Sequence, residues 1–158
     1  KEGDIKFYVT DIPLKDMLGK QVSSVTLYLR QDPRDLERIK INQTLLLKKD
    51  MALAIDPSIF CEDTNLAGTN LIIFAQKIGS NPIIATLNKT EAKITNRTLL
   101  DCGKQSLSHS KLVFKASNQS SIEKQGDCYV LNVANCEIMN VTERFMIGLY
   151  AHSQDIKI

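Results

Sequence analysis

The sequence has no tryptophan, no long apolar run and no clustered glycines. Without tryptophan, the chain lacks the core residue that is typical of a true immunoglobulin domain. The seven glycines stand singly, so no glycine-rich loop for binding phosphate is present. The longest unbroken apolar run, Leu71–Ala75, is far too short to cross a bilayer. We therefore expect a chain that does not span a membrane.

An excess of one charge is missing as well. Lys and Arg number 20 against 18 Asp and Glu, which gives a formal net charge of +2. Residues 1–60 carry ten basic and nine acidic side chains, and residues 61–158 repeat these numbers. A nucleic-acid-binding surface needs clustered basic side chains. We therefore expect no nucleic-acid partner.

Catalytic side chains are scarce, because the chain has only two histidines, His109 and His152. Each has a serine beside it, and an imidazole can act as general base for a serine hydroxyl. No G-x-S-x-G turn or other nucleophile setting accompanies either one. We expect both histidines to be exposed and idle, and we expect no enzyme activity and no cofactor. A small hydrolase that uses His109 or His152 is the second alternative.

Signals for asparagine-linked glycosylation are, in contrast, frequent. Half of the ten asparagines stand in N-x-S/T triplets without a central proline. Chance would give about one such triplet in a chain with this content of Ser and Thr. The five candidate acceptors are Asn42, Asn88, Asn96, Asn118 and Asn140.

Four cysteines, Cys61, Cys102, Cys128 and Cys136, accompany these triplets. The gaps between them are 41, 26 and 8 residues, which do not match the close ligand pairs of a zinc site. Two disulfides are therefore expected. Of the three possible pairings we favour Cys61–Cys102 with Cys128–Cys136, because the second pair would clasp a hairpin around Asn132. Disulfides and glycosylation signals together predict a secreted or cell-surface protein, with the bacterial periplasm as the alternative.

Apolar residues recur mostly with the period of strands. Residues 5–10 and 25–30 place apolar side chains at every second position, as half-buried strands do. In residues 145–150 Phe145, Ile147 and Leu149 alternate with Met146, Gly148 and Tyr150, which we interpret in the same way. Leu71–Ala75 is apolar throughout, as is typical of a central strand that is covered on both faces. Turn signals separate these segments at the spacing of a sandwich or barrel.

Helix signals are few and short. Pro33–Ile39 has Asp32 as its N-cap and proline at its first position. A second turn over Leu14–Leu18 would stop at Gly19. We therefore predict a single all-β domain over residues 1–158, an antiparallel β-sandwich of the Ig-like or jelly-roll-like Greek-key type, with at most one or two short helical turns.

In this strand pattern the five acceptors are not equivalent. Asn42 and Asn88 oppose the phase of neighbouring apolar residues, and Asn118 falls in a predicted turn, so these three fit surface glycans. Asn96 and Asn140 share the phase of inward apolar side chains and fit only if the chain turns locally.

Three tyrosines suggest a binding surface. Tyr8 and Tyr28 fall on the outward phase of their predicted strands, and Tyr150 ends another. Exposed tyrosine is favoured at interfaces because it offers contact area at small entropic cost. The predicted function is binding of another protein, through an apolar-aromatic patch free of N-x-S/T triplets. The first alternative is a subunit or accessory factor of a bacterial or viral assembly, which would expose a sheet edge.

Overall fold

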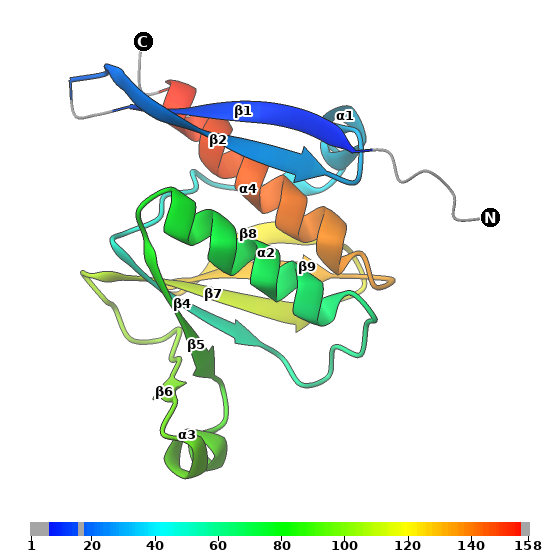
Figure 1. The fold of residues 1–158 in the computed structure, drawn as a ribbon. Helices are drawn as coiled ribbons and strands as arrows, with labels where there is room; N and C mark the ends of the chain where they lie inside the picture. Colours follow the sequence, from blue (N-terminus) through cyan, green and yellow to red (C-terminus); the bar gives the residue numbers. More distant parts are fainter. Residues whose placement is uncertain (1–6, 16–17, 156–158) are drawn as a thin grey trace.

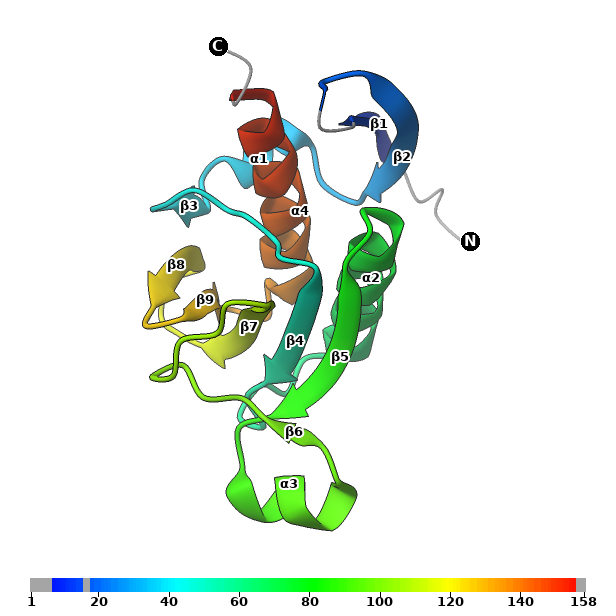
Figure 2. The ribbon, with the colours of Figure 1, turned by 90° about the vertical axis from the view of Figure 1, so that its left-hand side faces the viewer.

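Three layers of mixed α/β structure make up the chain (Figure 1). The computed structural model describes residues 7–15 and 18–155, and of residues 15 and 150–155 it describes the backbone only. A seven-stranded sheet forms the first layer, and helices α2 (Thr64–Lys77) and α4 (Ile138–Asp155) lie over one of its faces. A hairpin of β1 (Tyr8–Lys15) and β2 (Gln21–Leu29) lies against these helices on the side away from the sheet (Figure 2). No helix in the described part of the chain is long and apolar enough to span a membrane.

The sheet has the strand order β3-β8-β9-β7-β4-β5-β6. Its strands are β3 (Lys40–Ile41), β4 (Asp50–Ile55), β5 (Asn81–Thr86), β6 (Thr98–Leu99), β7 (His109–Ala116), β8 (Ser121–Gln125) and β9 (Cys128–Val133). Only β8 and β9 are antiparallel, and the other neighbours are parallel. Because parallel neighbours need a crossover connection, α2 carries the chain from β4 to β5.

The larger core lies between the sheet and the two helices. In β4, Met51 and Leu53 are buried in this core, whereas Ala52 and Ala54 are buried in a second cluster on the opposite face. Burial on both faces explains why apolar residues are consecutive in these strands, as is typical of parallel sheets. The side chains that fill the core from the other strands and from the helices include Leu71, Phe74, Leu112, Phe114, Leu131, Val141 and Phe145.

The opposite face of the sheet is covered by the connection between β6 and β7. Leu100 packs into the cluster on this face, and Cys102 forms a disulfide with the fully buried Cys128. The adjoining turn depends on Gly126, which has φ +59° and whose added Cβ would lie 2.2 Å from the carbonyl oxygen of Cys102. Glycine is therefore the residue that lets this connection approach the strand.

The hairpin confirms the predicted strand at residues 25–30, which lies in β2 except for its last residue. Val25, Leu27 and Leu29 are buried against the helices, and Tyr28 between them is exposed. The predicted strand over residues 5–10 begins at Tyr8 in the structure, and residues 5 and 6 lie outside the described part.

The predicted helix over Pro33–Ile39 is confirmed at its start but ends earlier, as α1 (Pro33–Leu36). The Asp32 carboxylate accepts a hydrogen bond of 2.9 Å from the Arg34 N–H. The other predicted turn, Leu14–Leu18, is wrong at its start, because Leu14 belongs to β1. Residues 16 and 17 lie outside the described part, and Gly19 follows with φ +78°.

The predicted antiparallel β-sandwich is wrong. The sheet is mixed and mostly parallel, Leu71–Ala75 lies in α2, and the alternating segment 145–150 lies in α4. Helix α4 packs against the sheet, against α2 and against the end of β2, and α2 carries the partly exposed Leu66 and Ile73 in addition to its buried side chains. Apolar residues therefore occur around much of the circumference of both helices. The narrow apolar stripe that marks a surface helix is therefore missing from the sequence.

All four cysteines form disulfides, as predicted, but the favoured pairing is wrong. Cys61 pairs with Cys136, and Cys102 pairs with Cys128. The expected hairpin around Asn132 is absent because this residue lies within β9, the strand that separates Cys128 from Cys136. Cys61 precedes α2 and Cys136 precedes α4, so their bridge ties together the starts of the two helices.

Candidate functional site

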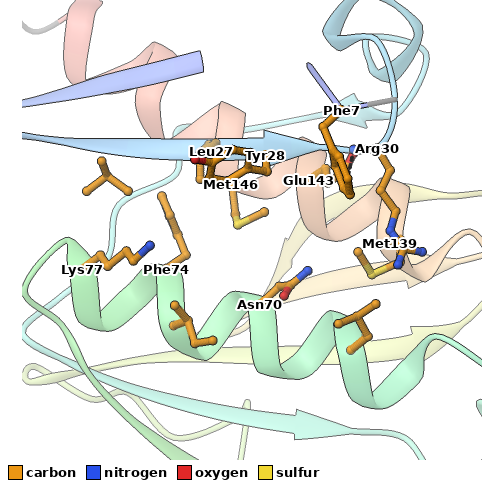
Figure 3. Close-up of a pocket in the computed structure, with 13 residues that line it drawn as sticks. Phe7, Leu27, Tyr28, Arg30, Asn70, Phe74, Lys77, Met139, Glu143 and Met146 are labelled. Atoms are coloured by element: carbon orange, nitrogen blue, oxygen red, sulfur yellow. Dashed lines mark hydrogen bonds between the residues drawn. The ribbon is translucent and has the colours of Figure 1, made fainter. Parts of the chain in front are cut away.

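A groove of about 330 Å³ opens between β2 and α2, with α4 as its floor (Figure 3). Side chains from β2 and from α2 form its two walls, and those of α4 lie between them. The residues that line it are Phe7, Val25, Leu27, Tyr28, Arg30, Leu66, Asn70, Ile73, Phe74, Lys77, Met139, Glu143 and Met146.

Large apolar side chains remain exposed along both walls of this groove. The exposed fractions are 65% for Tyr28, 51% for Phe7, 44% for Ile73 and 38% for Leu66. Scattered single apolar residues are common on protein surfaces, whereas a contiguous apolar patch usually marks an interaction site.

The floor of the groove consists partly of two methionines, Met139 and Met146, which are buried together with Phe74. Methionine side chains are unbranched and polarisable, so they adapt to ligands of different shape. The floor of the groove can therefore adapt its shape to what binds there.

Glu143 fixes the end of β2 to α4. Its carboxylate accepts hydrogen bonds from the backbone N–H groups of Arg30, at 2.8 Å, and of Gln31, at 3.3 Å. Burial raises the pKa of Glu143 above its usual value, although these two hydrogen bonds act in the opposite direction. The carboxylate thus serves as an internal acceptor for the chain leaving β2.

The two cations that line the groove differ in their partners. The Arg30 guanidinium lies 3.6 Å from the Asp63 carboxylate. Within the described residues Lys77 has neither an ion-pair nor a hydrogen-bond partner, and it lies at the other end of the groove from Arg30 (Figure 3). One end of the groove is thus compensated in charge, and the other carries a positive charge.

The structure brings one of the three predicted tyrosines to the groove. Tyr28 lines it, whereas Tyr8 is exposed on β1 opposite Leu29 and does not. Tyr150 lies in α4 rather than at a strand end, and its side chain is outside the described part. A role of these residues in binding stays a prediction.

The wall formed by α2 was missed in the sequence, because Leu71–Ala75 was predicted to be a strand. A signal was nevertheless present. Leu66, Asn70, Ile73 and Lys77 are spaced by four, three and four residues, which places them on one face of a helix.

Of the two histidines, only His109 has a described side chain, and it lies away from the groove. His109 begins β7, and its Nδ1 atom lies 2.8 Å from the hydroxyl of the adjacent Ser108 and 3.5 Å from that of Ser106. His109 does not line the groove, and the side chain of His152 is outside the described part. Among the described residues no group of three or more His, Cys, Asp or Glu side chains is placed to hold a metal ion.

None of the five candidate glycan acceptors lines the groove. Asn42, Asn88, Asn96 and Asn118 are exposed, and Asn140 is half-buried on α4. Asn96 was expected to fit a surface glycan only where the chain turns locally. Such a turn is present, because Asn96 ends α3 (Lys89–Thr95) in a left-handed conformation instead of lying in a strand. Modification of these residues stays a prediction.

A second pocket, of about 760 Å³, lies at the carboxyl ends of β4 and β5, between α2 and α3. Its lining is mixed, with Ile55, Ile72 and Ile84 beside polar side chains such as Thr64. The Thr64 hydroxyl oxygen is buried without a hydrogen-bond partner within the described residues. Asn88 also lines this pocket, so a glycan on its side chain would lie at the rim.

No known protein family matches the chain, and neither a curated protein sequence nor a solved structure is similar to it.

Proposed function

We propose that the chain is an extracytosolic, disulfide-bridged domain that binds another protein through the groove between β2 and α2. The observation that carries this proposal is the exposure of Tyr28, Phe7, Ile73 and Leu66 around one continuous groove. Covering these side chains with a partner removes apolar surface from water, which is the main favourable contribution to protein association.

The distribution of glycosylation signals supports the same surface. A glycan is bulky and hydrated, so an interface must be free of acceptors. None of the residues that line the groove is a candidate acceptor, whereas four acceptors are exposed elsewhere.

The proposed compartment is the secretory pathway and the outside of the cell. The two disulfides support it, because such bonds persist in oxidising compartments. The bacterial periplasm is also oxidising, and there the triplets would stay unmodified. The intact mass of natively expressed protein, measured before and after enzymatic removal of N-glycans, distinguishes the two. A mass that drops on deglycosylation supports the first compartment, and an unchanged mass supports the second.

A photo-crosslinking amino acid placed at Ile73 tests the groove directly. Ile94 on α3 is the matched control, because it is an isoleucine exposed to 79% that does not line the groove. The two labelled proteins are incubated with the surface and secreted proteins of their own source and irradiated. We expect a discrete crosslinked partner from position 73 and none from position 94. Equal crosslinking from both positions, or none from position 73, would contradict the proposal.

The alternative of a subunit in a bacterial or viral assembly is favoured by one observation, the unpaired edge of β2 described below. It differs from the first proposal in the size of the complex that the protein forms. Sedimentation of natively purified protein separates a complex of a few chains from one of many copies.

A further inference from the structure

β2 offers an unpaired edge beside the groove. It is hydrogen-bonded to β1 in a two-stranded sheet, and no other described strand pairs with it. Val25, Leu27 and Tyr28 of β2 line the groove, as does Arg30 directly after this strand. Among the described residues none of β1 lines it, and Phe7 directly before β1 is the one contribution from that side. The groove therefore runs along β2 and not along β1. An unpaired edge presents N–H and C=O groups that can accept a further strand.

The dimensions of the groove suit an extended peptide. From Val25 to Arg30 an extended chain covers about 17 Å. From Leu66 to Lys77 the helix rises by about 17 Å as well. The two walls are therefore matched in length, and five or six extended residues fill the space between them.

The lining defines which side chains such a peptide needs. Alternate side chains of an added strand point to the same side, about 7 Å apart, and would enter the groove above Met139 and Met146. Ile73 and Leu66 offer them apolar contact from α2. An acidic side chain at one end would meet Lys77, which lacks a partner in the described part of the chain. At the other end Arg30 is already paired with Asp63.

From these features we propose that the groove takes an extended segment of the partner protein, which adds to β2 as a third strand. The segment inserts alternate apolar side chains between β2 and α2 and places an acidic residue beside Lys77. This mode of recognition takes affinity from the main chain and specificity from alternate side chains. The inference rests on the proposed protein-binding function and specifies how the partner is held.

A second copy of this chain does not fit the groove in the same way. If β2 of another copy paired with β2, its apolar row would consist of Val25, Leu27 and Leu29. These side chains are already buried against the helices of their own copy and cannot enter the groove. The other face of the incoming strand carries the polar Ser24 and Thr26 between Val22 and Tyr28, so it offers no continuous apolar row to the space above the methionines. The occupant must have its own unburied apolar side chains.

A pooled library of octapeptides tests this mode on the intact, disulfide-bonded protein. Every second position is Val, Ile, Leu or Phe, the remaining positions are Ser or Thr, and Asp or Lys stands at either end. We expect the protein to enrich peptides with one terminal Asp over those with Lys. Lys77→Glu should reverse this preference, with a change of about 1.5-fold to fivefold in affinity for each terminal charge, as is usual for an exposed ion pair.

Backbone methylation separates strand pairing from simple filling of the groove. The best peptide is remade with N-methyl groups on alternate residues, in both possible phases. We expect one phase to abolish binding and the other to retain it, because only one set of N–H groups faces β2. If both methylated peptides bind as well as the parent, the inference is overturned while the groove remains a binding site.

The remaining outcomes also distinguish the two proposals. If position 73 crosslinks to a partner but the library yields no binder, strand addition is overturned and the proposed function stands. If neither experiment finds contact at the groove, both fail. If the protein alone dimerises in sedimentation and Ile73→Asp abolishes the dimer while Ile94→Asp does not, the occupant is a second copy and the inference is wrong.

Discussion

Removing the disulfides one at a time measures what each contributes to stability. Taken alone, the sequence separations of 75 residues for Cys61–Cys136 and 26 for Cys102–Cys128 give losses of about 4.5 and 3.5 kcal/mol from loop-closure entropy. The shorter loop lies inside the longer one, so removing the longer bridge alone frees roughly 50 residues and costs about 4 kcal/mol.

Burial changes the expected loss for the shorter bridge. Cys128 is fully buried in the cluster with Val113 and Val130, so its replacement by alanine also leaves a small cavity. This adds about 1 kcal/mol to the entropic loss. We therefore expect Cys61→Ala/Cys136→Ala and Cys102→Ala/Cys128→Ala to be destabilised by similar amounts, about 4 and about 4.5 kcal/mol respectively.

Equilibrium unfolding in urea without reductant, followed by circular dichroism, is the assay. Each double variant should unfold at a lower urea concentration than the wild type and with a steeper dependence on urea, because the unfolded chain becomes less compact. Wild type under reductant should lose more than either variant. A double variant with the same midpoint as wild type would refute the assignment of that bridge as a stabilising crosslink.

Three further predictions concern single positions. Glu143→Gln keeps an acceptor for the chain leaving β2 but removes a buried charge. Because the folded-state pKa of Glu143 is raised above its usual 4.5, the wild type should lose stability relative to this variant as the pH rises above that value. A difference in unfolding free energy that stays constant between pH 4 and 8 in urea titrations would contradict this reasoning. Relative to Glu143→Gln, Glu143→Ala should cost about 1–3 kcal/mol at every pH by leaving backbone N–H groups unpaired. Gly126→Ala should hinder formation of the shorter disulfide, since the new Cβ meets the Cys102 carbonyl oxygen at 2.2 Å, and thiol labelling of the unreduced protein should then reveal free cysteine. If Asn88 carries a glycan, Asn88→Asp should remove it while keeping the cap of α3, where the side-chain oxygen accepts from the Thr90 and Glu91 N–H groups. Thr90→Ala should also remove the glycan but keep asparagine as the cap. Glycopeptide mass spectrometry and thermal unfolding of both variants check that the helix survives without the sugar.

Features set by neighbouring residues were predictable from the sequence. The alternation of Val25, Leu27 and Leu29 predicts β2 because the hairpin has one face against the helices and one face in water. Asp32 before Pro33 predicts the start of α1, since the cap and the proline act within the first turn. Such patterns depend on burial or geometry within one element.

The topology was not predictable in this way, because it depends on which elements cover one another. In α4, Phe145 and Met146 are both buried although they are adjacent, since the helix contacts the sheet and the hairpin at once. The alternation of Phe145, Ile147 and Leu149 is therefore a coincidence of apolar content and not a strand period. The groove could not be predicted for the same reason, since one of its walls is α2, in which the sequence pattern predicts a strand.

The Cys61–Cys136 disulfide determines whether the molecule stays together after cleavage by a protease. Helix α3 has no buried residues and projects beyond the sheet, so it is an exposed site for cleavage (Figure 2). A cut there divides the chain into one piece with Cys61 and another with Cys136, which remain joined by their bridge. The two pieces are also held by the parallel pairing of β4 with β7. The groove lies on the opposite side of the helices from α3, so a nicked, two-chain form is expected to retain the groove and the binding proposed for it.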